Sequence, residues 1–146
     1  MEEKSAEAVV FLDASVLVAA VLSPTGGSFR VIIESAVRGF LLITSRYAYR
    51  ETEHTLVIKY PEKFIELQHI ISHVVIVPDA PQKIVASVLP LIDFKDAPVF
   101  AAALAQKVHA LLTLDRVHFI ENQALQKNTP SLKILTPGDF IKIYFV

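Results

Sequence analysis

The sequence contains no cysteine and no tryptophan among its 146 residues. Without cysteine the chain has neither a disulfide framework nor thiolate chemistry, and a zinc site would have to use histidine and carboxylate ligands only. An excess of one charge is also lacking, because 14 Lys and Arg against 15 Asp and Glu leave a formal net charge of −1. No global basic field can therefore recruit nucleic acid or an anionic membrane, so any polyanion has to be bound by local groups.

Long apolar runs and phosphate-binding glycine motifs are missing as well. The longest apolar runs, Val16–Leu22 and Ala97–Ala105, are too short to span a bilayer, while the hydrophobic content of 53% excludes a disordered chain. Gly26-Gly27 lacks the following Lys-Ser or Lys-Thr of a P-loop, and no glycine-rich dinucleotide fingerprint follows a strand. The acidic opening lacks the basic region of a signal peptide, which favours a soluble, cytoplasmic protein with no membrane partner.

The length and the even composition predict one domain. A chain of this size buries roughly 68–70% of the surface that it exposes when unfolded, which is enough for a real hydrophobic core. No repeat, low-complexity tract or Pro/Gly/Ser-rich linker divides the sequence. We therefore expect a single domain over residues 1–146, with residues 1–7 as a flexible N-terminal extension.

Short apolar segments alternate with longer segments of helical spacing. The short segments predict buried strands at Val9–Leu12, Phe40–Ile43, Val74–Val77, His109–Leu114 and Leu132–Leu135. Helices are expected at Ser15–Leu22, Ser28–Arg38, Tyr47–Tyr60, Glu62–Ser72, Gln82–Leu89, Ala97–Lys107 and from Pro137 onward. Strands that are apolar on both faces belong to a parallel sheet covered on both sides. The predicted fold is α/β, a three-layer α/β/α sandwich with a central parallel sheet of about five strands.

Acidic residues follow two of the predicted strands. Asp13 comes directly after the first strand, Asp115 follows the fourth, and Asp93 and Asp96 lie just before the helix of Ala97–Lys107. Ligands of open parallel sheets bind beyond the carboxyl ends of the strands. If the strands that precede Asp13 and Asp115 are neighbours, both carboxylates emerge within a few ångströms of each other at one edge.

Each of these acids also has a purely structural interpretation. An aspartate at a strand-to-helix junction caps the helix and contributes about 1 kcal/mol, and Asp96 suits this role because Pro98 follows it. Asp13 suits it less, since Ser15 is available as a cap and a buried charge is costly unless it is paired or metal-bound. Glu51 and Glu53 point roughly 200° apart on their helix, so only one can face a common site. The pattern alone does not choose between them, and either fits a solvated helix charge.

The order and spacing of five short motifs resemble the PIN-domain family, which is named after the N-terminal region of a pilus-associated ATPase. The motifs span residues 9 to 142 and are Phe11-Leu12-Asp13-Ala14-Ser15, Thr44-Ser45 leading to Glu51, Asp93-Phe94-Lys95-Asp96-Ala97-Pro98, Leu112-Thr113-Leu114-Asp115 and Ile134-Leu135-Thr136-Pro137-Gly138-Asp139. The resemblance implies a five-stranded parallel α/β/α sandwich. It also implies a metal site made of Asp13, Glu51, Asp96 and Asp115, with Ser15 and Thr113 as supporting residues and Asp93 as a frequent further acid.

The chain departs from this family pattern beyond its last aspartate. Many relatives place a further acid two or three residues later, where this chain has Val117 and His118. The resemblance therefore leaves open whether one metal ion or two would bind. We interpret His118 as an ordinary loop histidine, with contact to substrate as the alternative.

Converging carboxylates require a cation. Two carboxylates about 5 Å apart repel by roughly 3 kcal/mol at an effective dielectric constant near 20. A site with carboxylates and hydroxyls but no thiolate suits Mg²⁺ or Mn²⁺, which can promote hydrolysis of a phosphodiester. The resemblance implies an endoribonuclease, including the toxins of toxin–antitoxin pairs. Asp13, Asp96 and Asp115 would then hold the metal, and Glu51 would complete its shell or orient the attacking water.

Binding of a polyanion beside these acids requires nearby cations. The candidates flank the proposed acids and are Arg46, Arg50, Lys95 and Arg116, although each is also compatible with ordinary surface charge. The closing segment Phe140–Val146 is too apolar to lie free in water, so it packs on the core or on another chain. We expect RNA as the substrate, a homodimer, and an antitoxin protein as a partner if the chain is a toxin.

Other functional classes remain open at this stage. A catalytically silent PIN-like module that binds RNA or protein would keep the acids as caps or as a structural ion site. Phosphoryl transfer through an aspartyl nucleophile would also place an acid after a first strand, but Ser15 stands where that chemistry needs a second aspartate. A receiver domain would need paired acids after the first strand and a lysine after the last, and neither is present.

Overall fold

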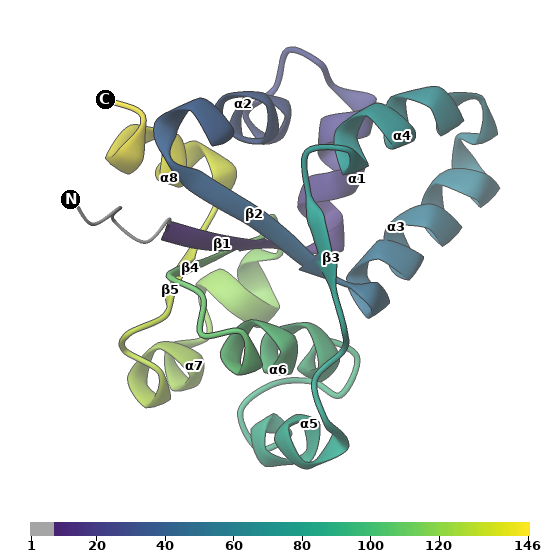
Figure 1. The fold of residues 1–146 in the computed structure, drawn as a ribbon. Coiled ribbons are helices and arrows are strands. Elements are labelled where there is room, and N and C mark those ends of the chain that lie inside the picture. The colour runs from purple at the N-terminus through teal and green to yellow at the C-terminus, as the bar shows by residue number, and fades with distance from the viewer. Residues whose placement is uncertain (1–7) are drawn as a thin grey trace, which may run out of the picture.

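The computed structural model describes residues 8–146, and the predicted flexible extension over residues 1–7 lies outside the described residues. Five strands are present at β1 (Ala8–Leu12), β2 (Phe40–Ser45), β3 (Val75–Val77), β4 (Ala110–Leu112) and β5 (Lys133–Leu135). The α-helices are α1 (Ala14–Leu22), α2 (Gly27–Glu34), α3 (Arg46–Lys59), α4 (Phe64–Ile71), α5 (Gln82–Val88), α6 (Ala97–Ala105), α7 (Gln123–Asn128) and α8 (Pro137–Tyr144). Short helical turns lie at η1 (Ala36–Arg38), η2 (Pro61–Lys63) and η3 (Arg116–Ile120) (Figure 1).

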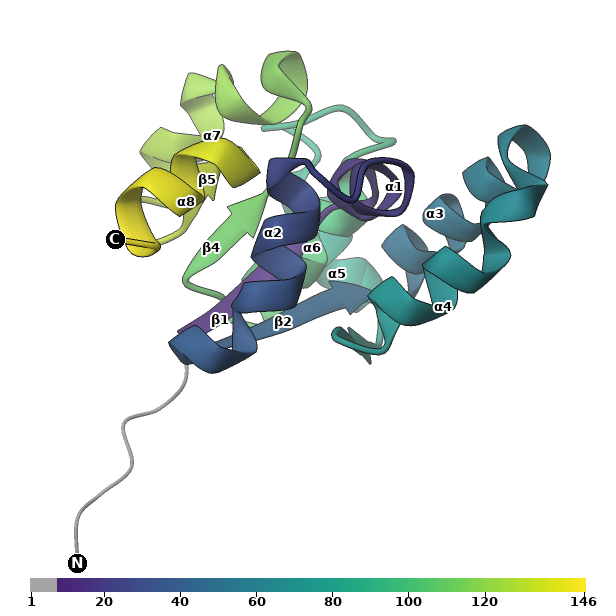
Figure 2. The same ribbon diagram turned by 90° about the horizontal axis from the view of Figure 1, so that it is seen from above.

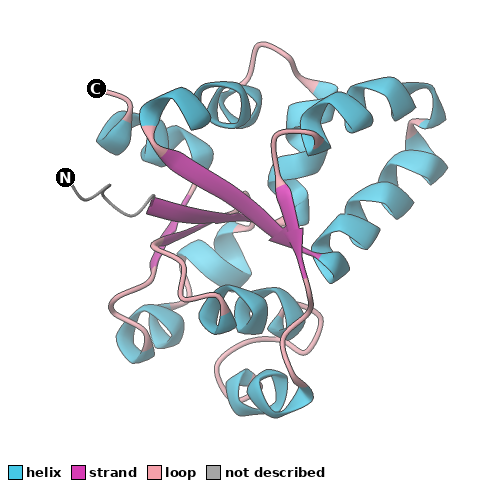
Figure 3. Ribbon diagram, viewed as in Figure 1, coloured by secondary structure: helices cyan, strands magenta, loops and turns pink. Residues whose placement is uncertain are grey.

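All five strands form one parallel sheet in the order β3-β2-β1-β4-β5. The register pairs Leu12 of β1 with Leu112 of β4, so the residues that follow these two strands emerge side by side. Helices cover both faces of the sheet, with α1, α2 and α8 on one side and α5, α6 and α7 on the other (Figures 1 and 3). The predicted α/β/α sandwich with a parallel sheet of five strands is confirmed.

Each face of the sheet has its own hydrophobic core, because successive strand residues point to opposite sides. Val10 and Leu12 of β1 pack with α1, α2, α4 and α8, whereas Phe11 packs with α5, α6 and α7. Leu112 and Leu111 of β4 divide between the two cores in the same way. The central strands are therefore apolar on both faces, as their continuous apolar runs predicted.

Helices α3 and α4 form a pair that projects beyond the carboxyl end of β2 (Figures 1 and 2). Ser45 caps α3 by accepting a hydrogen bond from the backbone N–H of Ala48 at 3.1 Å, and Pro61 begins the short turn that follows this helix.

The neighbouring strand β3 was predicted to be buried, but it lies at the sheet edge. Val75 and Ile76 are 50% and 41% exposed, so that prediction was wrong. An apolar run alone does not distinguish an edge strand from a central one.

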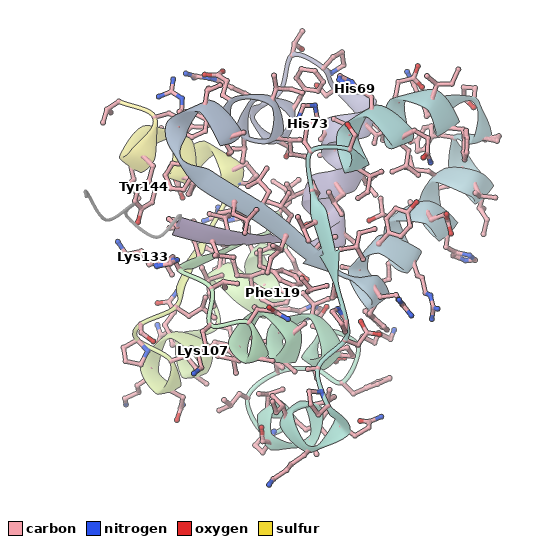
Figure 4. The ribbon with its side chains drawn as sticks, in the orientation of Figure 1. His69, His73, Lys107, Phe119, Lys133 and Tyr144 are labelled. Atoms are coloured by element: carbon pink, nitrogen blue, oxygen red, sulfur yellow. The ribbon has the colours of Figure 1, made fainter. Side chains whose placement is uncertain are left out.

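The C-terminal segment packs on the core of its own chain. Phe140 of α8 is buried, and its ring lies 5.1 Å from that of Phe40 at the start of β2. Tyr144 and Lys133 lie side by side at the amino-terminal end of the sheet, where the lysine Nζ donates a hydrogen bond to the tyrosine hydroxyl at 3.0 Å (Figure 4). The sequence left open whether this segment packs on its own core or on another chain. Phe140 packs on the core of its own chain, while Val146 is fully exposed.

Two elements between β4 and β5 were not predicted. A π-helical turn, η3, follows Asp115, and the short helix α7 follows it with Asn122 as its cap. Only Phe119 in η3 and Leu125 in α7 are buried, so neither element has an apolar periodicity that could be seen in the sequence.

Among residues 8–146 no single helix is both long and apolar enough to cross a membrane. The pair α1 and α2 reaches that length and composition only together, across a bend of 98°.

Candidate functional site

The site is built around the carboxylate of Asp13, which lies where β1 ends and α1 begins. Its side chain is 8% exposed and accepts three hydrogen bonds. Oδ1 accepts from the backbone N–H of Ala14 at 2.8 Å, and Oδ2 accepts from the hydroxyls of Ser15 at 3.0 Å and Thr113 at 2.8 Å. Asp13 is itself the residue that caps α1, so the prediction that Ser15 would cap this helix was wrong. Ser15 instead holds the carboxylate in place.

Thr113 joins the end of β1 to the end of β4. While its hydroxyl donates to Asp13, the same oxygen accepts from the backbone N–H of Asp115 at 3.0 Å. The hydroxyl of Ser15 accepts from the backbone N–H of Leu114 at 3.0 Å in a second link between the two segments. The two supporting residues thus orient Asp13 and also fix the backbone that carries Asp115.

Asp96 reaches the same edge from the start of α6. It occupies the cap position of this helix, but its side chain makes no capping hydrogen bond within the described chain. Its carboxylate Oδ2 lies 3.1 Å from Nδ1 of His118 instead. Capping therefore does not account for the Asp96 side chain, and the loop before it is ordered by Asp93, whose Oδ1 accepts from the backbone N–H of Lys95 at 2.9 Å.

The two glutamates of α3 have different surroundings. The charges of Asp13 and Asp96 contribute to a raised pKa of Glu51, so this residue interacts electrostatically with the acidic cluster. Glu53 accepts a hydrogen bond from the Tyr49 hydroxyl at 3.4 Å and lines the groove between α3 and α4. Helical geometry alone could not show this difference between Glu51 and Glu53.

His118 belongs to the site, which the sequence reasoning missed. Its Nδ1 lies 3.0 Å from Oδ2 of Asp115 and 3.1 Å from Oδ2 of Asp96. One ligand atom from each of these three residues falls within 4.8 Å of the other two. The interpretation of His118 as an ordinary loop histidine was wrong because η3 turns its ring back onto the cluster. Its three-residue spacing from Asp115 was the only signal in the sequence.

The clustering raises the pKa of several carboxyl groups. Burial is the largest cause for Asp13, whose hydrogen bonds from Thr113, Ser15 and Ala14 lower the pKa without cancelling the rise. Desolvation likewise raises the pKa of Asp96, with the charges of Asp115 and Asp13 adding to it and His118 opposing it. The side chain of Glu51 is largely exposed as a whole, but partial desolvation of its carboxyl group and the charges of Asp13 and Asp96 raise its pKa.

The four acids fit a hard divalent cation by the chemistry of their donor atoms. All are carboxylates, they come from four separate segments, and their negative charges disfavour one another. Oxygen ligands with surplus negative charge are what Mg²⁺ and Mn²⁺ prefer. The negative charges of Asp115 and Asp96 also raise the pKa of His118, which favours the protonated imidazole beside them.

The four proposed phosphate contacts differ in their surroundings. Arg46 begins α3 and is exposed, and Lys95 is exposed on the loop before Asp96. Arg50 lines the groove between α3 and α4. Arg116 pairs with Glu121 through Nε at 3.3 Å, a contact exposed on both sides. Exposed ion pairs of this kind contribute under about 1 kcal/mol, so a phosphate can compete for Arg116.

Because the pKa of Asp13 is raised, we expect the stability of the metal-free protein to depend on pH. Because this pKa is higher in the folded chain, the contribution of Asp13 to stability is full below the unfolded value near 3.8 and is lost as the pH rises through the folded value. Asp13→Asn removes that loss. As the pH rises above about 4, we expect the free energy of unfolding of the variant to increase relative to that of the parent, measured by urea unfolding with a chelator present. Glu66→Gln on α4 controls for loss of an exposed carboxylate, and a pH-independent difference for Asp13→Asn would contradict the prediction.

Comparison with solved structures gives the same fold. A chain of the VapBC2 complex from Rickettsia felis, solved with a DNA fragment from its promoter, has a TM-score of 0.68 at 14% identity and covers 86% of this chain and 96% of its own. PAE2754 from Pyrobaculum aerophilum has a TM-score of 0.65 at 17% identity and covers 95% and 91%. VapC20 from Mycobacterium tuberculosis, described as a toxin that cleaves the sarcin–ricin loop, has a TM-score of 0.55 at 14% identity and covers 74% and 91%.

At such low identities these likenesses establish the fold alone, and the search of curated protein sequences gave no match. A sequence model of one family, described as the PIN domain, matches residues 9–117. This segment includes Asp13, Glu51, Asp96 and Asp115. The chain therefore belongs to the PIN-domain family.

Proposed function

We propose that this protein is a divalent-metal-dependent nuclease of the PIN type that hydrolyses phosphodiester bonds in RNA. The observation that carries the proposal is the buried carboxylate of Asp13, which Ser15 and Thr113 hold beside Asp115. Burial and the charge of Asp115 disfavour the ionised form of Asp13 in the metal-free fold. The hydrogen bonds from Ser15 and Thr113 offset only part of the cost of burying this carboxylate. A bound cation would offset the rest, so metal binding explains the arrangement better than a purely structural role does.

The proposed roles follow from where each side chain lies. Asp13, Asp96 and Asp115 would hold Mg²⁺ or Mn²⁺, and Glu51 would complete the shell or orient the attacking water. When bound, the ion would neutralise the carboxylates, hold a phosphodiester oxygen and lower the pKa of a coordinated water. Ser15 and Thr113 would keep Asp13 in one orientation, and Asp93 would fix the loop that carries Asp96.

RNA is the proposed substrate, and the cytoplasm is the proposed location. VapC20, which shares the fold, is described as cleaving the sarcin–ricin loop, and this supports an RNA backbone over other phosphodiesters. Arg46, Arg50, Lys95 and Arg116 would contact phosphates around the acidic centre. These local cations are needed because the chain as a whole carries a formal net charge of −1.

A protein antitoxin is the proposed partner. Solved structures with this fold include the R. felis VapBC2 complex, VapBC-1 from Haemophilus influenzae and a toxin–antitoxin complex from Klebsiella pneumoniae. In the present chain a groove of about 530 Å³ separates α3 from α4. Val57 and Phe64 line it and are each 59% exposed, so the groove offers apolar surface to the apolar face of a partner segment.

The central test is metal-dependent cleavage of mixed structured RNAs. With Mn²⁺ or Mg²⁺ the parent should cleave, and Asp96→Asn should cut the rate at least about 100-fold because one negatively charged metal ligand becomes a neutral amide. Circular dichroism establishes that the variant is folded, and Glu66→Gln serves as the matched carboxylate-to-amide control. Equal rates for the parent and Asp96→Asn, or no cleavage of any RNA by the parent, would favour the catalytically silent module.

The phosphate contacts are tested by the salt dependence of RNA binding. In an Asp96→Asn background, which suppresses cleavage, Arg46→Ala or Arg50→Ala should each weaken binding and reduce the slope of log K against log salt by roughly 0.7–0.9. Fluorescence anisotropy at several salt concentrations measures this slope, and Lys127→Ala on α7 is the control. An unchanged slope would remove the substituted arginine from the RNA footprint.

The expected homodimer is tested by mass. Ile143 is 49% exposed and Val146 fully exposed at the C-terminal end, so this end offers apolar surface to a second copy. Light scattering at micromolar concentration should give twice the 16.2 kDa of one chain. The monomer mass at that concentration would contradict the expectation.

A further inference from the structure

The ring of His118 stands between two carboxylates of the proposed metal site. Its Nδ1 lies 3.0 Å from Asp115 Oδ2 and 3.1 Å from Asp96 Oδ2. In an octahedral shell with metal–ligand bonds of about 2.1 Å, adjacent ligand atoms lie about 3 Å apart. The imidazole nitrogen has this spacing from each carboxylate oxygen, and one ligand atom from each of the three residues lies within 4.8 Å of the other two, so a cation could bind among them with limited movement of the side chains.

The backbone around His118 is held in position although its ring is half exposed. Asp115 Oδ1 accepts from the backbone N–H of His118 at 3.0 Å. The side-chain amide of Asn122 donates to the carbonyl of His118 at 3.0 Å and to that of Leu91 at 2.9 Å. Phe119, the next residue, is buried in the core between the sheet and α6 (Figure 4). The ring is therefore presented to the carboxylates from a fixed backbone, while its exposed side leaves room for an ion to enter from solvent.

We infer that His118 binds the catalytic metal ion directly through Nδ1, and that the site therefore selects Mn²⁺ over Mg²⁺. This inference rests on the proposed function. Mg²⁺ takes oxygen ligands almost exclusively, whereas Mn²⁺ accepts carboxylates and imidazole in the same shell. A site that contains Asp96, Asp115 and His118 thus supplies carboxylates that neutralise the cation and a nitrogen donor that Mg²⁺ uses poorly.

The alternative role for His118 is that of a protonated counter-ion, which would hold the two carboxylates together without binding metal. In that role the protonated ring has to move away from the two carboxylates when a cation binds to them. Replacing it would then change the affinities for Mn²⁺ and Mg²⁺ by similar factors. The two roles therefore differ in metal selectivity and in whether a nitrogen nucleus is bonded to the ion.

The test measures metal binding by the purified full chain without RNA. Isothermal titration should show Mn²⁺ binding at least about 10-fold more tightly than Mg²⁺. His118→Ala should weaken Mn²⁺ binding by about 10–100-fold and Mg²⁺ binding by less than about 3-fold. His118→Asp, which supplies an oxygen donor, should reverse the selectivity towards Mg²⁺. His73→Ala, which replaces an exposed histidine in the turn after α4, is the matched control and should leave both affinities unchanged.

A spectroscopic measurement separates direct ligation from an indirect effect. Electron spin-echo envelope modulation of bound Mn²⁺ should show coupling to ¹⁴N in the parent and in His73→Ala, and none in His118→Ala. Parent protein that binds Mn²⁺ without ¹⁴N coupling, or equal losses of both metals in His118→Ala, would overturn this inference while leaving the nuclease proposal intact. Parent protein that binds neither metal would overturn both.

Discussion

The proposed site is organised around the buried carboxylate of Asp13. The carboxylate of Asp13 closes the central strand β1, is 8% exposed, and is held by two hydroxyls and one backbone N–H. These contacts offset only part of its desolvation, since the pKa of Asp13 is still raised. A chain that keeps such a group gives up stability at neutral pH unless a cation restores it. The same hydroxyls join β1 to β4, so the site and the sheet edge are stabilised by one hydrogen-bond network.

The parallel sheet explains how residues far apart in the sequence meet. β1 and β4 are neighbours in register, so residues 13 and 113 emerge together although one hundred positions separate them. The helix α3 leaves the neighbouring strand β2 and carries Glu51 to the same edge, and α6 brings Asp96. Two dense cores, one on each face, keep the strand ends fixed relative to one another. Asp96 and Asp115 thereby come within 4.8 Å of each other together with His118, while Asp13 and Glu51 interact electrostatically with this cluster.

The sequence alone predicted the layers, the strands and the acids that follow them, because fully buried strands have continuous apolar runs. It could not show that β3 is an edge strand, since Val75 and Ile76 are as apolar as any central pair. Helical geometry could not separate Glu51 from Glu53 without knowing which face of α3 meets the sheet edge. His118 was missed because η3 is a five-residue π-helical turn with one buried residue, a local geometry that has no periodic signature.

We propose that a divalent ion binds where the ends of β1 and β4, the start of α6 and the turn η3 meet. Crystals grown with Mn²⁺ test this most directly, through an anomalous difference map recorded near the manganese absorption edge. We expect a strong manganese peak within coordination distance of Asp13, Asp96 and Asp115, with Nδ1 of His118 in the same coordination shell. A well-ordered site that contains no manganese peak, or manganese bound only elsewhere on the molecule, would contradict it.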